Sequence, residues 1–91
     1  MNTLFLLMAQ YNGQVIIPLG SVCADYFSHL TEQNLRRKVA LGDIDLPVVQ
    51  IENSKQSARG VHIQDLANYI DKQCELARAD HERLWNRGKT K

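Results

Sequence analysis

The sequence LTEQNLRRKVALGDIDLPVV, residues 30–49, joins a helix start, a basic triplet and the beginning of a β-branched run. Thr31 is a favourable N-cap, and Glu32 stands where a carboxylate stabilises the positive first turn of a helix. Gly42 is placed to cap the other end. We therefore predict a short helix over residues 32–41, followed at once by a strand.

The two faces of this predicted helix differ in character. Leu35 and Val39 are four positions apart and share one face, which we expect to pack on a core. The polar side chains point away from that face or lie along its flank, namely Gln33, Asn34, Arg36, Arg37 and Lys38. Taken alone, a basic triplet on a helix is more often a solvated face than a nucleic-acid surface. In this helix we expect the triplet Arg36-Arg37-Lys38 to point outward and not into the core.

The segment before this helix is predicted to support it. Residues 3–11 favour a helix, since Leu, Met, Ala and Gln lose little rotamer freedom there, although a strand entering an Asn12-Gly13 hairpin is the alternative. Residues 15–17 follow as a short extended piece. Pro18 then fits the first turn of a second helix, which a tight turn connects to the basic helix. The apolar stripe of this second helix comprises Leu19, Val22, Cys23 and Tyr26.

A hairpin is predicted after the basic helix. Residues 47–51 and 60–63 are rich in β-branched side chains. The polar loop between them, which we assign to residues 52–60, carries Lys55 and Arg59 at its tip and end.

The last predicted helix runs from about Gln64 to about residue 85 and is too long for one small core to cover. Beyond the core its apolar stripe ends with Cys74, Ala77, His81, Leu84 and Trp85. This suggests a homodimer through the C-terminal helix, which the apolar segment 4–8 could join; a partly frayed terminal helix is the alternative. We expect a single domain over residues 1–86 and a frayed basic tail at residues 87–91.

Helix, tight turn, polar-faced helix, hairpin and helix is the order of a winged helix-turn-helix, an α+β fold that is mostly α. The major groove of B-DNA admits one helix whose outer side chains reach base edges, while the hairpin would reach the backbone or the minor groove. Ser21, in the first turn of the supporting helix, could offer its hydroxyl or N–H to a phosphate. The predicted DNA-binding residues are therefore Gln33, Asn34, Arg36, Arg37, Lys38, Lys55, Arg59 and Ser21.

Other kinds of site have little support in the sequence. Cys23 and Cys74 lack CxxC spacing and fall on apolar helical positions, so we expect reduced core residues of a cytoplasmic protein. The histidines lack the paired spacing of metal ligands, namely His29, His62 and His81. No nucleophile arrangement and no glycine-rich phosphate loop is present. We predict no enzyme, no metal site and no cofactor.

The distribution of charged and apolar residues limits the classes of partner that the chain could bind. The net charge is only +1, but all 11 lysines and arginines lie within residues 36–91, so the first third can offer a polyanion only backbone amides and neutral side chains. The apolar run at residues 4–9 is far shorter than the roughly 20 residues that span a bilayer, and no basic residue precedes it. We expect no membrane contact and predict double-stranded DNA as the partner.

Two resemblances agree with this interpretation. The chain resembles the small excisionase-type winged helix domains over two segments. These are residues 15–49, VIIPLGSVCADYFSHLTEQNLRRKVALGDIDLPVV, and residues 60–71, GVHIQDLANYID. More specifically, the chain is similar to the pyocin activator protein family, known as PrtN. The similar segments are MNTLFLLMAQY, VIIPLGSVCADYFSHLT, GDIDLPVV and SARGVHIQDLANYID. This likeness covers residues 1 to about 72.

The second resemblance implies a bacterial or prophage-borne transcription activator that binds DNA upstream of bacteriocin or phage-tail-like gene clusters. Such a protein would be cytoplasmic, nucleoid-associated when bound, and a partner of RNA polymerase. The resemblance assigns no DNA-contacting residue. An excisionase-like architectural protein that bends DNA, and a protein-interaction module with an acidic partner, are the two alternatives.

Overall fold

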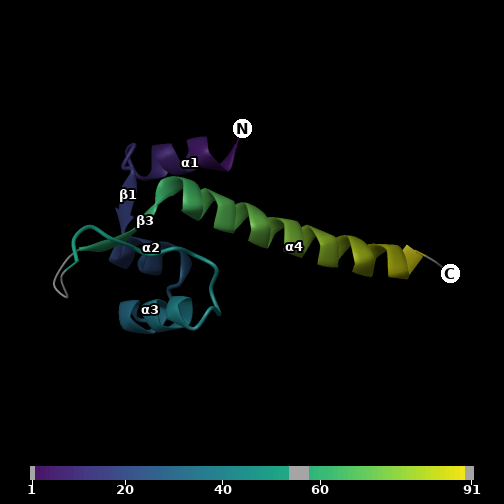
Figure 1. Ribbon diagram of the computed structural model, residues 1–91. Helices are drawn as coiled ribbons and strands as arrows, with labels where there is room; N and C mark the ends of the chain where they lie inside the picture. The colour runs from purple at the N-terminus through teal and green to yellow at the C-terminus, as the bar shows by residue number, and fades with distance from the viewer. Residues whose placement is uncertain (1, 54–57, 90–91) are drawn as a thin grey trace.

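The computed structural model describes residues 2–53 and 58–89 of the 91-residue chain. Its elements are α1 (Thr3–Gln10), β1 (Ile16–Pro18), α2 (Leu19–Tyr26), α3 (Glu32–Ala40), β2 (Val49–Gln50), β3 (Arg59–His62) and α4 (Ile63–Lys89). Figure 1 shows α1 and α3 on opposite sides of the body, with α2 between them and α4 leaving as a long rod. The fold is mostly helical with a small antiparallel sheet, as the sequence predicts.

The sheet has three strands, one more than the predicted hairpin. β3 lies in the middle and pairs antiparallel with β1 on one side and with β2 on the other. Residues 15–17, expected only as an extended piece, thus contribute to an edge strand because β3 has a second row of backbone groups to satisfy. β2 is shorter than the strand predicted at residues 47–51.

β1 comes very close to β3 at Gly60. A Cβ atom added to Gly60 would lie 2.6 Å from the carbonyl oxygen of Ile17 and 2.6 Å from Cγ2 of Ile16. Gly60 is also paired with Val49 of β2. The three strands can therefore pack at this register only around a glycine.

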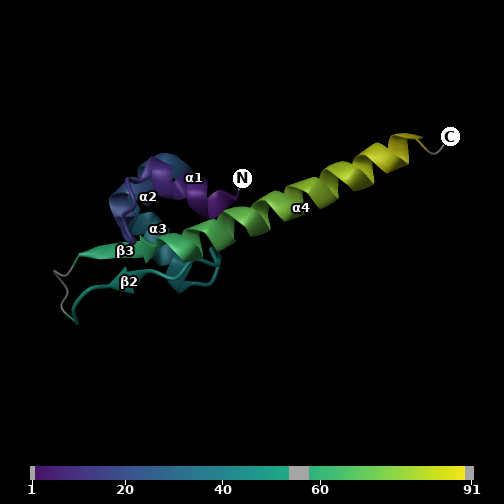
Figure 2. The same ribbon diagram turned by 90° about the horizontal axis from the view of Figure 1, so that it is seen from above.

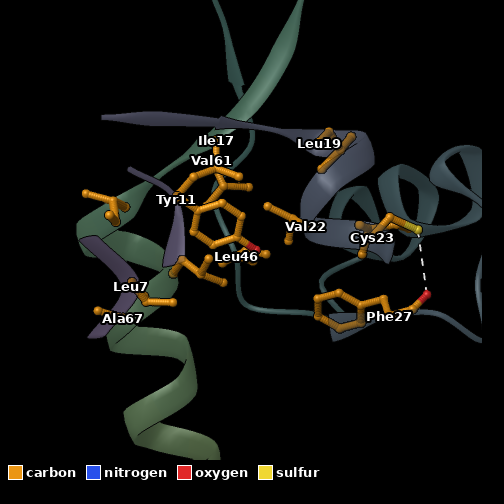
Figure 3. Packing of buried hydrophobic residues seen from close by; sticks show 13 residues of the cluster. Leu7, Tyr11, Ile17, Leu19, Val22, Cys23, Phe27, Leu46, Val61 and Ala67 are labelled. Carbon is orange, nitrogen blue, oxygen red and sulfur yellow. Dashed lines mark hydrogen bonds between the residues drawn. The ribbon is translucent and has the colours of Figure 1, made fainter. Parts of the chain in front are cut away.

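One apolar core joins the helices and the sheet (Figure 3). The side chains that are less than a tenth exposed are Leu7, Tyr11, Ile17, Leu19, Val22, Cys23, Phe27, Leu35, Leu46, Val61, Ile63, Leu66 and Ala67. The Tyr11 hydroxyl donates a hydrogen bond of 2.6 Å to the Asp25 carboxylate, which ties α1 to α2. Burial, and then this carboxylate, raises the pKa of Tyr11 well above its usual value.

The N-terminal segment is a helix and not a strand of a hairpin. The Asn2 side chain accepts a hydrogen bond of 2.9 Å from the N–H of Phe5, which caps α1 at its start. Asn12 and Gly13 have left-handed φ values of 56° and 75°, which end the helical path. The helical interpretation of residues 3–11 is confirmed.

α2 departs from the predicted pattern at both ends. Pro18 is the last residue of β1 and the N-cap of α2, so the helix begins at Leu19 and the placement of the proline inside the first turn was wrong. Tyr26 was assigned to the buried stripe, but it is exposed and donates a hydrogen bond of 2.8 Å to Gln10. α2 ends there, and the non-helical backbone of Phe27 (φ −133°) turns that ring into the core instead.

α4 is much longer than the body that it packs on. Thr3 donates a hydrogen bond to Asp71, Cys74 is half-buried, and all side chains of residues 75–87 are exposed. The helix continues through Lys89, beyond the predicted end of the domain, and the molecule measures 59 × 30 × 19 Å. Figure 2 shows α4 and the hairpin extending in opposite directions. We call residues 75–89 the projecting half of α4. Of the described helices, none combines the length and the apolarity needed to cross a bilayer.

Candidate nucleic-acid interface

α3 is stabilised at both ends as the sequence predicts. The Thr31 side chain accepts a hydrogen bond of 3.1 Å from the N–H of Asn34, and Glu32 stands in the first turn. At the other end Gly42 adopts φ +82°, a left-handed conformation that favours glycine. Because capping groups meet the backbone at both ends, a helix of only nine residues is well defined.

The body holds the inner face of α3. Leu35 is fully buried and Val39 is half-buried, so the predicted inner face is confirmed. The turn that enters α3 is fixed by Cys23 of α2, whose thiol donates a hydrogen bond of 3.2 Å to the Leu30 carbonyl. Since packing fixes the inner face, it also fixes the direction in which the outer face points.

The outer face of α3 carries polar side chains into solvent. Its exposed residues are Gln33, Asn34, Arg36 and Arg37, and Lys38 on the flank is half-buried. The ion pairs within the described residues join Lys72 to Asp45 and Arg83 to Asp80. The basic triplet of α3 takes part in neither pair, so its charges are directed outward and not neutralised by a carboxylate in the described part of the chain.

The hairpin brings another cation to the same surface. An open cleft between α3 and the sheet is lined by Arg36, Val39, Ala40, Val48, Gln50 and Arg59. A second groove, along the outer side of α3, is lined by Gln33, Arg36, Arg37 and Ala40. Arg36 borders both hollows and thereby connects the outer face of α3 to the hairpin.

Gln50 belongs to this cleft, although sequence reasoning did not single it out. Gln50 and Arg59 are directly opposite each other in the antiparallel ladder of β2 and β3. Their juxtaposition depends on the hairpin register, which the sequence does not specify over so long a loop. The available signal in the sequence was that Gln50 is a polar residue near the end of the strand predicted at residues 47–51.

Two predicted residues, Ser21 and Lys55, lie neither on α3 nor on the described part of the hairpin. Ser21 is half-buried in the first turn of α2. Its neighbour Gly20 lies close to Glu32, because a Cβ atom on Gly20 would be 3.1 Å from a Glu32 carboxylate oxygen. A phosphate at Ser21 would therefore approach a carboxylate. Lys55 lies outside the described residues, and its place beside α3 stays a prediction.

His62 and His81 each contact a residue of α4. The His62 ring accepts a hydrogen bond of 3.0 Å from the N–H of Gln64, and the His81 ring stacks on Trp85 with centroids 6.3 Å apart. Across residues 2–53 and 58–89, no three His, Cys, Asp or Glu side chains are grouped so that they could hold a metal ion.

Residues 3–77 match the family described as pyocin activator protein PrtN. The chain belongs to the pyocin activator family. The match includes α3 and the hairpin, and it confirms the resemblance to the pyocin activator protein family. No curated protein and no solved structure matches the chain. Activator families of this kind are generally not enzymes.

The pyocin activator match ends at Ala77, close to where α4 leaves the body. The candidate interface on α3 and β3 thus lies wholly within the matched part. Most of the projecting half of α4 lies beyond it, so what that half does must be argued from its own residues.

Proposed function

We propose that this pyocin activator family member is a sequence-specific, DNA-binding transcription activator of bacteriocin or prophage gene clusters, with α3 as its recognition helix. One observation carries the proposal: Arg36 and Arg37 point outward from a helix whose inner face is buried, and Arg59 of the hairpin lines the adjoining cleft. A single α-helix fits the major groove when its outer side chains are free to reach base edges. The order of α2, a tight turn, α3 and the hairpin supports the proposal of a winged helix-turn-helix.

The outer residues of α3 have the chemistry for direct base recognition. The planar guanidinium groups of Arg36 and Arg37 can donate two parallel hydrogen bonds to O6 and N7 of guanine. Gln33 and Asn34 can pair in the same way with N6 and N7 of adenine. Lys38 is a half-buried point charge on the flank, which suits a phosphate better than a base.

The hairpin, residues 52–60, is the wing of the proposed complex and lies on the backbone or in the minor groove. Arg59 stands at the base of this hairpin and shares the cleft with Arg36. Together with Lys55 it supplies charge that follows the phosphates beside the recognition helix. The Ser21 hydroxyl, on the supporting helix α2, is the proposed contact to a further phosphate, although the Glu32 carboxylate lies nearby.

Two protein partners complete the proposal. The activator is a homodimer through α4, whose projecting half extends away from the surface of α3 (Figures 1 and 2). RNA polymerase is the second partner, as expected for an activator. The protein acts in the bacterial cytoplasm, on the nucleoid when bound.

The proposal is tested by footprinting the protein on the DNA upstream of bacteriocin and phage-tail-like gene clusters. The wild-type chain should protect a defined site, and the double variant Arg36→Ala/Arg37→Ala should lose that protection. The matched control is Lys72→Ala/Arg83→Ala, which removes the same charge from exposed positions of α4. If both double variants reduce protection equally, α3 is not the recognition helix.

DNA bending separates an activator from an architectural, excisionase-like protein. Strong bending of the bound site in a circular-permutation gel shift would favour the architectural role. The absence of any duplex binding would favour a protein-interaction module, in which the same basic helix contacts an acidic partner.

A further inference from the structure

The outer face of α1 is apolar although it lies at the surface. Residues 3–10 contain no charged side chain. Leu7 points into the core, whereas Phe5, Leu6 and Met8 on the other side are 59%, 54% and 42% exposed. A helix that is apolar all round is normally covered on every side. We call Phe5, Leu6 and Met8 the outer face of α1.

The projecting half of α4 carries a second apolar surface. Apolar and small residues, interrupted by His81, recur along α4 at alternating spacings of four and three, the heptad pattern of packed helices. The pattern comprises Ile63, Ala67, Ile70 and Cys74 in the body and continues with Ala77, His81 and Leu84 beyond it. Trp85 adjoins this stripe, stacks on His81 and is 57% exposed. The side of α4 that packs on the core thus continues into solvent.

The size of the two surfaces indicates that they belong to one interface. Their five large exposed side chains leave on the order of 500 Å² of apolar surface in water, about half on each helix. A standard interface takes about 800 Å² from each partner, of which about 65% is apolar in homodimers. Either surface alone is too small, whereas the two together reach the required area.

A second copy of the chain brings both surfaces at once. In a two-fold dimer, residue i of one copy contacts residue j of the other and the reverse contact is made as well. The outer face of each α1 can then cover the projecting half of the other copy's α4. The absence of charge on α1 fits an apolar stripe and leaves no cation on this helix to contact a nucleic acid.

The position of α1 decides how the helices run. The hydrogen bond from Thr3 to Asp71 places the start of α1 beside α4 just before the projecting half begins. Trp85 lies about 21 Å further along α4, at 1.5 Å per residue. If two α4 helices ran parallel, Trp85 would stay about that far from the other copy's α1. Only the antiparallel arrangement brings the end of each α4 to the α1 of its partner.

We propose that two copies pair with the projecting halves of α4 antiparallel, so that Leu84 and Trp85 of each copy pack on Phe5 and Met8 of the other. This arrangement rests on the homodimer proposed above and specifies its geometry. It extends past the region that matches the family.

Charge-pair variants of the full-length chain test the proposal by sedimentation velocity. Phe5→Lys and Trp85→Glu should each weaken self-association at least about 30-fold, because each places a charge in the centre of both symmetric contacts. Mixing the two variants should restore a dimer, since the introduced ammonium group then faces the introduced carboxylate in one contact while the other contact is wild type. Circular dichroism checks that both variants keep their helices.

Leu76→Glu is the matched control. Leu76 is 53% exposed on the same half of α4, but it lies about 100° round the helix from Ala77 and off the stripe. This variant should stay dimeric. Trp85 is the only tryptophan of the sequence, so its emission should shift to the blue as the concentration of the wild-type chain rises. The Phe5→Lys variant should lack this shift.

The outcomes separate the two levels of the proposal. A wild-type chain that stays monomeric at all concentrations overturns the homodimer itself. A wild-type dimer that Phe5→Lys leaves intact overturns the role of α1 while the homodimer stands. Failure of the mixed variants to associate, although each one alone is folded and monomeric, overturns the reciprocal antiparallel contact.

Discussion

At the scale of single residues, the proposed role of Arg36 and Arg37 is to recognise bases, and that of Lys38 is to contact a phosphate. Arg36→Ala and Arg37→Ala should each weaken binding to the specific site by about 1–3 kcal/mol and relax the preference at one base pair, because a bidentate contact is lost. Arg37→Lys should keep much of the affinity but not the preference. Competition with single-base variants of the footprinted site measures both effects. Unchanged affinity and preference in Arg37→Ala would mean that the recognition helix has been misassigned.

Tyr11 is the residue through which high pH should destabilise the fold. Its pKa is raised in the folded chain, chiefly by burial and then by Asp25. Below pH 10 the hydroxyl is protonated in both the folded and the unfolded state, so its contribution is fully present. Above that value the unfolded chain loses the proton first and the free energy of unfolding falls as pH rises.

Urea denaturation between neutral and alkaline pH measures this contribution. Tyr11→Phe should cost about 1 kcal/mol at neutral pH, the net value of one hydrogen bond, and should reduce the alkaline loss of stability. Part of the loss should remain, because burial also raises the pKa of Tyr69. An alkaline loss that is the same in Tyr11→Phe and wild type would contradict the assignment.

At the scale of elements, the contact between β1 and β3 depends on the missing side chain of Gly60. Gly60→Ala should lower the free energy of unfolding by about 1–3 kcal/mol, because the added Cβ meets the backbone of Ile17, which cannot move aside. Gly20→Ala is the control, since among the described residues an added Cβ atom would meet only the flexible end of the Glu32 side chain, and alanine favours a helix. Equal stability of the two variants would show that β1 can shift away from β3.

The hairpin is expected to add affinity without adding specificity. Arg59→Ala should weaken binding to specific and random duplexes by similar factors, because a phosphate contact carries no sequence information. Parallel titrations of the two duplexes measure this. A loss confined to the specific duplex would place Arg59 on a base edge instead.

How well an element could be predicted depended on whether its signals were local. α3 was predicted almost to the residue, because the Thr31 cap, the Leu35–Val39 spacing and Gly42 all act within one helix. The pairing of β1 with β3 and the meeting of Gln50 with Arg59 were not, since both depend on a register between distant segments. Phe27 was missed because it enters the core only where the helical period breaks.

At the scale of the whole molecule, the net charge of +1 accompanies an uneven distribution of charged residues along the chain. α3, which carries three basic residues, and α1, which carries no charged residue, lie on opposite sides of the body (Figure 1). Length and composition indicated one domain with an over-long last helix. They suggested that the apolar segment 4–8 could join a contact with a second copy, but they could not indicate which of its side chains are exposed, because an apolar run looks the same whether it covers its own core or that of a neighbour.

The most direct test of the central claim, that α3 and the hairpin bind duplex DNA, is the salt dependence of binding of the wild-type chain to the footprinted duplex, followed by fluorescence anisotropy. Neutralising about four to six phosphates predicts that log K falls against log salt with a slope near −4 to −5. A flat salt dependence, or no binding to the duplex at any salt concentration, would contradict it.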